Sequence, residues 1–568
     1  MDLASVIPWL HTIGGARSRH PPPRTPADGM SALRAQAVLS TLLLVAACGG
    51  GDGGGNRPPG SQAQGGTAIV GVLGDFQAFN PVTNTHFSTQ DVERNMLFTP
   101  LIQFDEKLNP RPYLAQSWVM TGDTGVTFKL HQDVKWHDGK PVTAEDVKFT
   151  FDLAKNPKTT SGLVGSVYLT QVKSATVIDP HTIHFGFEAP HAQALEDFWW
   201  SPLPKHLLGS VTPDQLAQHP FNRNPVGSGP FKFREWRPTQ SLTLEANPDF
   251  PQSMGGPPKL QRVVFRVIPE ATTLVTELLN GTADVIGWTL LPDQATQVRN
   301  QKTFTLNHFP SREFYYVGWN NEKAPFNDAA VRRALSMAIN KPRMIQGLLG
   351  GFGQPASGVI PPWSPMYTDV SAGDRFDPAA AKQALAAAGW RDTNGDGIVE
   401  KNGQPLRFRL LTNSENRLRQ DIAQYVQQQL RAVGADAQVQ TIEFQTMLTQ
   451  HKARQYDAII TSWILDTFRV DPSALFSCAE ARKAGSANRT GYCNPQADAL
   501  MQRGTRSTDD AQTKATWAEF SRLIQQDQPL TTLFWIEDLA GVGPRIQNVT
   551  MDPRSKLVNV TQWTKQAR

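Results

Sequence analysis

The segment that most constrains the fold runs from Gln455 to Cys478 and reads QYDAIITSWILDTFRVDPSALFSC. From Ala458 to Leu465 most residues are apolar or β-branched and follow no helical period, which predicts a strand buried on both faces. This strand ends at Asp466, just after Trp463. Ligands of α/β proteins bind beyond the carboxyl ends of such strands, where a carboxylate can bind an ammonium and an indole can form an apolar wall. Alternatively, Asp466 closes a turn or caps the following helix.

Residues 30–48 read MSALRAQAVLSTLLLVAAC and have the composition of a secretory signal: one arginine, an apolar run, and small residues before Cys48. The apolar run is too short to cross a bilayer. The final VAAC resembles the bacterial lipobox, whose cysteine carries a lipid. We therefore expect a leader and lipoprotein signal over residues 1–48, translation from Met30, and lipidation of Cys48.

Residues 49–66 are rich in glycine and predict a flexible tether between the lipid and the folded body. A lipid with more than one chain anchors a protein stably, so we expect the protein to work at a membrane surface. The body that follows has about 500 residues, more than one hydrophobic core usually serves. The chain is therefore expected to form at least two lobes.

Charge and cysteine content narrow the class of protein. The sequence has 55 basic and 51 acidic residues, a net charge of +4 and no run of lysines or arginines, so nothing indicates a nucleic-acid partner. With Cys48 assigned to the lipid, Cys478 and Cys493 remain as a pair in an oxidising compartment. We expect a disulfide between them, since a metal site would need more ligands than two thiols.

The sequence lacks the common catalytic and nucleotide-binding motifs: it has no G-x-S-x-G elbow, no H-E-x-x-H and no phosphate loop. Asp392, Asn394 and Asp396 copy the first half of a calcium-binding loop, but the twelfth position is Gly403 rather than a glutamate. We therefore expect no metal site, no cofactor and no enzymatic activity.

Several segments share one resemblance: TAIVGVLGDFQAFNPVT (67–83), the block from 97 to 152, VGSGPFKFREWRP (226–238) and the stretch from 314 to 345. They resemble the extracellular solute-binding proteins of family 5, which are receptors of peptide and nickel ABC importers. The resemblance implies an α/β, two-lobed periplasmic-binding-protein-like fold of type II, with an extra inserted subdomain and a ligand cleft between the lobes. It assigns residues 67–315 and 530–568 to lobe I, about 105–225 to the inserted subdomain, and 316–529 to lobe II.

The same resemblance suggests which residues touch the ligand. SWILD is similar to the strand end where peptide receptors place the aspartate that holds the peptide amino terminus, which falls on Asp466. Trp463, Asn80 and Trp319 are expected as wall or rim residues. LFSC and GYCNPQADAL resemble the dipeptide receptors, including their disulfide, although this chain has two more residues between Trp463 and Asp471, and Leu465 replaces a small residue.

Together these features predict a lipid-anchored receptor on the extracytoplasmic or periplasmic face of the membrane. It would act as a monomer, capture peptides between two closing lobes and deliver them to the permease of an ABC importer. An oligosaccharide, a nickel complex or another small solute is the alternative cargo. A lipid-anchored hydrolase is the third hypothesis, and the absence of any nucleophile–base pattern argues against it.

Overall fold

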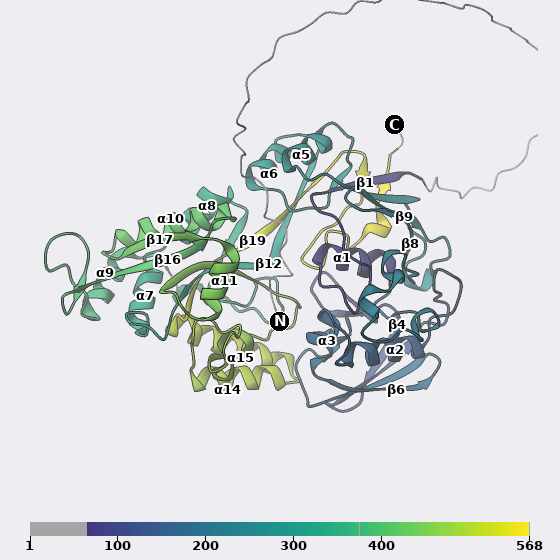
Figure 1. Ribbon diagram of the computed structural model, residues 1–568, viewed down its shortest axis with the longest axis horizontal. Helices are drawn as coiled ribbons and strands as arrows, with labels where there is room; N and C mark the ends of the chain where they lie inside the picture. The colour runs from purple at the N-terminus through teal and green to yellow at the C-terminus, as the bar shows by residue number, and fades with distance from the viewer. Residues whose placement is uncertain (1–64, 374, 567–568) are drawn as a thin grey trace, which may run out of the picture.

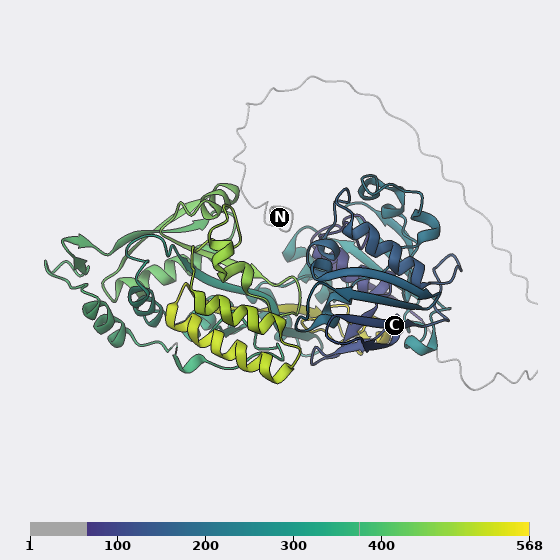
Figure 2. The same ribbon diagram turned by 90° about the horizontal axis from the view of Figure 1, so that it is seen from below.

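The computed structural model describes residues 65–373 and 375–566, and these residues form two lobes of mixed helix and sheet. The lobes lie side by side and are joined by two long strands, β12 (Thr305–Trp319) and β19 (Leu530–Val542) (Figure 1). The view from below shows the same division (Figure 2). The predicted α/β class and two-lobed architecture are confirmed. The leader, Met30, Cys48 and nearly all of the tether lie outside the described residues.

One 11-stranded sheet runs through both lobes in the order β17-β16-β18-β12-β19-β11-β1-β10-β9-β8, with β13 paired to β19. Its other strands are β1 (Thr67–Val72), β8 (Phe231–Arg237), β9 (Ser241–Ala246), β10 (Arg262–Val267), β11 (Val285–Ile286), β13 (Gly353–Pro355), β16 (Arg407–Asn413), β17 (Asp436–Ile442) and β18 (Ala458–Ile464).

The ladder between β12 and β19 is irregular where one lobe gives way to the other. Thr305–Pro310 pairs with Glu537–Val542, and Phe314–Gly318 pairs with Leu530–Trp535, with a register shift between Pro310 and Phe314. Such an irregularity bends a strand and weakens local pairing. The lobe boundaries predicted from the sequence fall within or beside these two strands, and the division at those residues remains a prediction.

A separate antiparallel sheet, β4-β5-β7-β6, lies within the segment predicted as an inserted subdomain. Its strands are β4 (Ala115–Met120), β5 (Gly125–Leu130), β6 (Val172–Asp179) and β7 (Thr182–Phe187), and α2 (Ala144–Lys155) contacts it. Helix α2 begins as predicted: Thr143 is the N-cap, and its backbone N–H donates to the carboxylate of Asp146 at 2.9 Å.

Lobe II contains the parallel strands β16, β17 and β18. Two hydrophobic clusters lie in this lobe. One includes α7 (Ala329–Met337), α9 (Pro378–Ala387) and α10 (Arg417–Arg431), and the other includes α14 (Pro495–Arg506) and α15 (Asp510–Asp527). The first four residues of β18 are buried as predicted, whereas its last three are partly or fully exposed. The strand therefore leaves the core at the end that carries Asp466.

The remaining elements are short or peripheral to the site. They are α1 (Phe87–Val92), a π-helical turn (Glu93–Leu97), β2 (Ile102–Phe104), β3 (Pro110–Pro112), α3 (Leu163–Ser166), α4 (Lys205–Leu208), α5 (Ala271–Leu279), α6 (Pro292–Arg299), α8 (Lys341–Leu349), β14 (Glu400–Lys401), β15 (Gln404–Pro405), α11 (Phe444–Lys452), α12 (Ser473–Phe476), α13 (Cys478–Ala481), β20 (Ile546–Gln547) and β21 (Thr564–Lys565), with several 3-10 turns. None of the helices placed in residues 65–566 is long and apolar enough to cross a membrane.

Candidate ligand-binding site

Asp466 lies two residues beyond the end of β18, at the edge where β16, β17 and β18 all present their carboxyl ends. Its side chain is exposed, and its carboxylate accepts no hydrogen bond from any residue that the structure describes. Desolvation nevertheless raises the pKa of Asp466, and Arg312 opposes this shift. The carboxylate is therefore open to solvent, and its charge is influenced both by the surrounding protein and by Arg312.

The structural alternative for Asp466 was that it caps the next helix. That helix is α12, and its N-cap is Pro472 rather than Asp466. Among the described residues, Asp466 forms one hydrogen bond, in which its backbone carbonyl accepts from Arg312 Nη1 at 3.3 Å. The side chain therefore stabilises no described helix end, and its carboxylate is free to bind a ligand.

Arg312 occupies the irregular part of β12, between the two lobes, and is 7% exposed. Its guanidinium lies over the ring of Phe87 in lobe I, at 4.5 Å, and near the ring of Phe468 in lobe II, at 5.6 Å. Burial lowers the pKa of Arg312, and Asp91 and Asp466 are among the groups that oppose this shift. Arg312 thus contributes a positive charge at the lobe junction, directly beside Asp466.

On the lobe I side, the junction carries further charges. Burial raises the pKa of Asp91 to about 6, although Arg312, Lys556 and Arg94 all oppose the shift. Burial alone would raise the pKa of Asp538, but Lys556, whose Nζ lies 2.9 Å from the Asp538 carboxylate, brings it below its usual value. The junction therefore holds buried groups of both charges, and Lys556 and Asp538 are paired with each other.

The segment that follows Asp466 crosses to the other lobe. Phe468 is 3% exposed, and its ring centroid lies 5.3 Å from that of Phe104, 5.1 Å from Trp199 and 5.5 Å from Trp363. Phe104 and Trp199 belong to the lobe I side, whereas Trp363 belongs to lobe II. Edge and tilted aromatic contacts of this kind give a firm apolar contact between the lobes.

Next to Phe468, an ion pair joins the lobes: Arg469 of lobe II contacts the carboxylate of Asp197, in the segment predicted as an inserted subdomain. We call this contact the inter-lobe ion pair. Asp197 is 1% exposed, and its second oxygen lies 2.7 Å from His191 Nε2. The backbone N–H of Val470 donates to the Gln193 side chain at 3.1 Å. Residues 466–470 therefore combine the free carboxylate with the contacts that hold the lobes together.

The other predicted site residues are placed differently. Trp463 lies on β18 opposite Phe314 and is partly buried, three residues before Asp466. Trp319 pairs with Ala458 at the far end of that strand and is fully buried; its indole stacks on Phe326 at 5.0 Å and donates to Thr531 Oγ1. Trp319 is therefore part of the lobe II core in this structure.

Asn80 is also fully buried, in lobe I. Its Nδ2 donates to Asn222 Oδ1 at 2.9 Å, and its Oδ1 accepts from the backbone N–H of Val82 at 3.0 Å. These bonds fix the loop after β1. The structure thus places Trp463 three residues before Asp466, near the end of β18, and places Trp319 and Asn80 in the protein interior. A ligand role for all three stays a prediction.

Arg312, Phe468 and Arg469 were missed in the sequence analysis. Their partners lie far away along the chain: Arg469 and Asp197 are separated by 272 positions. One signal was available for Arg312, because Ser311-Arg312-Glu313 is a polar interruption in an otherwise strand-like segment.

The structure also describes the predicted disulfide and the calcium-like loop. Cys478 and Cys493 are bonded in the structure. In the loop, carboxylate oxygens of Asp392, Asp396 and Glu400 lie within 4.8 Å of one another. Glu400 already accepts from Thr393 and Asn394, and Asp392 accepts from backbone N–H groups of the loop. Carboxylate oxygens of this cluster therefore already accept hydrogen bonds from groups within the same loop.

Comparison with known proteins shows which protein family the chain belongs to. The model for "Bacterial extracellular solute-binding proteins, family 5 Middle" matches residues 109–484. The chain belongs to this family. It is 33% identical over 514 residues to the oligopeptide-binding protein AppA of Bacillus subtilis (strain 168), covering 89% of this chain and 92% of AppA. It is 26% identical over 515 residues to the dipeptide-binding protein of Escherichia coli (strain K12), covering 85% and 92% of the two chains.

Solved structures show the same relationship. The structure of AppA from Bacillus subtilis in complex with a nonapeptide is similar with a TM-score of 0.70 at 31% identity, covering 89% of this chain and 99% of that one. NikZ from Campylobacter jejuni in complex with Ni(L-His) shares the fold, with a TM-score of 0.71 at 24% identity and coverage of 88% and 99%. Family 5 proteins are transport receptors, so this chain is a solute-binding receptor of an ABC importer and not an enzyme.

Proposed function

We propose that this receptor binds peptides at the junction between its lobes, with Asp466 holding the peptide amino terminus, and delivers them to the permease of an ABC importer. The observation that carries the proposal is the free carboxylate of Asp466, which follows β18, lies beside Arg312 and caps no helix. A charge-assisted hydrogen bond to an ammonium is the strongest contact such a group can make. The relatives named as oligopeptide- and dipeptide-binding proteins support a peptide cargo.

Lobe closure completes the proposed mechanism. β12 and β19 connect the lobes through an irregular ladder, while residues 466–470 contact the inserted subdomain. A ligand that touches both lobes favours the arrangement in which these contacts form, because it binds that arrangement more tightly. We expect the receptor to act as a monomer and to remain at the membrane through a lipid on Cys48, with the glycine-rich segment as its tether.

Identification of the cargo tests this proposal. The full chain is purified in a mild detergent without denaturation, and the bound molecules are released and analysed by mass spectrometry. We expect peptides with free amino termini. Recovery of an oligosaccharide or a nickel complex in stoichiometric amount, with no peptide, would contradict the peptide proposal and favour the alternative cargo.

A further inference from the structure

Residues 191–197, which we call the latch segment, touch lobe II. One contact is the inter-lobe ion pair. Another is the hydrogen bond from the backbone N–H of Val470 to the side chain of Gln193, at 3.1 Å. In a further contact, the backbone N–H of Ala192 donates to the carbonyl of Thr505, in α14, at 2.8 Å. This short segment is therefore a junction between the predicted inserted subdomain and lobe II.

Within the latch segment, the carboxyl group of Glu196 is buried, and the residue is 5% exposed. Its Oε1 accepts a hydrogen bond from Gln193 Nε2 at 2.6 Å. Among the residues that the structure describes, its Oε2 has no hydrogen-bond partner, and Glu196 forms no ion pair. An isolated carboxylate in such a place is costly, and a buried acid avoids this cost by keeping its proton. The geometry therefore indicates a neutral carboxylic acid at Glu196.

The charges around Glu196 agree with this assignment. The cation of lobe II, Arg469, contacts the neighbouring carboxylate, that of Asp197. Asp197 also lies 2.7 Å from His191 Nε2. Burial raises the pKa of Glu196 to about 8. The negative charges of Asp197 and of Asp510 in α15 add to this increase, whereas Arg469 opposes it. Glu196 therefore keeps its proton at neutral pH while the lobes touch.

Gln193 connects Glu196 to lobe II. Its amide nitrogen donates to Glu196 Oε1, and its amide oxygen accepts from the backbone N–H of Val470. The backbone of Gln193 has a φ of 54°, in the left-handed region that residues with a side chain rarely adopt. Such a conformation persists where the surrounding contacts hold it in place. The side chain that bonds Glu196 is therefore itself held by contact with lobe II.

Separation of the lobes would change the surroundings of Glu196. Arg469, Val470 and Asp510 all lie in the part of the chain assigned to lobe II, so each would move away from the latch segment. Gln193 would lose its bond to Val470, and water would reach the carboxyl group. The pKa of a hydrated carboxyl group returns towards its ordinary value, well below 7. Glu196 would then release its proton to the solvent.

We propose that Glu196 is a proton-binding site that couples closure of the lobes to pH. On closing, the lobes take up one proton from the solvent at this carboxyl group, and they release it on separating. Acid therefore favours closure, and this contribution is lost as the pH rises towards 8. The equilibrium constant for closure should fall by up to about tenfold per pH unit between about pH 5 and 8 and level off above that range. This inference goes beyond the proposed function and does not depend on which solute is bound.

The distance between the lobes in the unliganded protein tests the proposal. The full chain is freed of bound molecules by dialysis and spin-labelled through the substitutions Lys173→Cys in β6 and Arg522→Cys in α15. Both positions are exposed, one in the predicted inserted subdomain and one in lobe II. Pulsed electron paramagnetic resonance then gives the populations of short and long distances from about pH 6.5 to 9. This range lies above the pKa of Asp91 at the junction, about 6.

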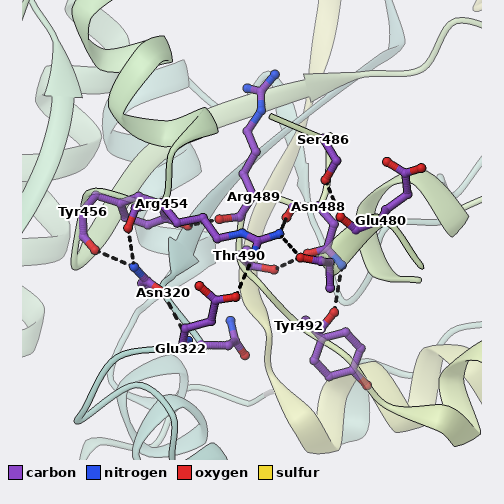
Figure 3. A network of polar contacts seen from close by, with 12 residues as sticks. Asn320, Glu322, Arg454, Tyr456, Glu480, Ser486, Asn488, Arg489, Thr490 and Tyr492 are labelled. Carbon is purple, nitrogen blue, oxygen red and sulfur yellow. Dashed lines mark hydrogen bonds and ion pairs between the residues drawn. The ribbon is translucent and has the colours of Figure 1, made fainter. Parts of the chain in front are cut away.

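Glu196→Gln is the decisive variant, because glutamine stays neutral at every pH. The matched control is Glu322→Gln: Glu322 pairs with Arg454 at 2.6 Å entirely within lobe II (Figure 3). In the wild type and the control, we expect the ratio of long to short distances to rise about tenfold or more over this pH range. Glu196→Gln should keep the distances of the wild type at pH 6.5 throughout. If Glu196→Gln fails to fold by circular dichroism, Glu196→Asp serves; it retains a titratable group in a changed position and should shift at a different pH.

Two results would overturn the inference. If the distances in the wild type do not change between pH 6.5 and 9, closure of the lobes is not coupled to a proton. If Glu196→Gln shifts as the wild type does, or Glu196→Asp shifts at the same pH as the wild type, Glu196 is not the group that binds the proton. The experiment uses no peptide, so the peptide proposal stands in either case; its own failure would appear in the identity of the co-purifying cargo.

Discussion

The inter-lobe ion pair gives a prediction about affinity that involves no ligand contact. Arg469 and Asp197 come from different lobes, and their side chains are 15% and 1% exposed. Arg469→Gln keeps most of the side-chain length but removes the charge. The variant leaves the Asp197 carboxylate buried with His191 as its remaining partner, at 2.7 Å.

The cost follows from this environment. Removing one partner of a buried ion pair costs about 3–5 kcal/mol when the other charge is left without compensation. His191 remains in contact with Asp197, so we expect a smaller cost, about 2 kcal/mol. This free energy is lost only from the arrangement in which the lobes touch. A peptide that binds this arrangement should therefore bind the variant up to about thirtyfold more weakly.

Calorimetry with the co-purifying peptide measures this effect. The matched control is Arg503→Gln, which removes an ion pair with Glu519 that lies entirely within lobe II. The control should bind like the wild type. If Arg469→Gln also binds within about threefold of the wild type, which is less than 1 kcal/mol, the ion pair does not contribute to the ligand-bound arrangement and the reasoning is refuted.

Three further predictions concern other parts of the chain. Cys48→Ser should release the protein from membranes into the soluble fraction on cell fractionation, and unchanged membrane association would rule out lipidation at Cys48. Burial raises the pKa of Glu196 to about 8, above its value in the unfolded chain, so stability should fall as pH rises towards 8; denaturant titrations should show that Glu196→Gln removes a slope of up to about 1.4 kcal/mol per pH unit, and an unchanged slope would contradict the assignment. Trp319→Ala should lower the free energy of unfolding by about 3–5 kcal/mol, as for a core tryptophan, and a loss of affinity without a loss of stability would instead support its predicted ligand role.

Local sequence patterns predicted these helices and strands well, because capping and the spacing of apolar residues depend on neighbours in the sequence. The start of α2 was predicted from Thr143, Glu145 and Asp146 alone. Strand β18 was predicted from an apolar, β-branched run that ends before Asp466. The resemblance to family 5 supplied the two-lobed arrangement, which periodicity alone could not provide.

The residues around the candidate site were harder to predict. Asn80 lies in the loop after β1 and Trp319 is the last residue of β12, but both side chains are buried in the lobe cores, and the sequence does not reveal which side of a strand end faces solvent. Arg312 is a single arginine within a strand-like segment. Its significance comes from its burial and from the nearby Asp91 and Asp466, which meet it only once distant segments have come together.

The central claim is that Asp466 pairs with the amino terminus of a bound peptide, and a double-mutant cycle tests it most directly. Calorimetry would compare the wild type and Asp466→Asn, each with a peptide bearing a free or an acetylated amino terminus. Truncating one partner of a desolvated charge pair costs about 2–5 kcal/mol, and because Asp466 is exposed in the free protein we expect the lower end, roughly thirtyfold in affinity.

The account predicts that Asp466→Asn and acetylation each weaken binding by this amount, and that the two changes together cost little more than either one alone. Asp466→Asn should leave the thermal stability of the free protein unchanged, since the carboxylate accepts no hydrogen bond from any described residue. Tight binding of the free-amino peptide by Asp466→Asn, or fully additive losses in the cycle, would contradict the claim.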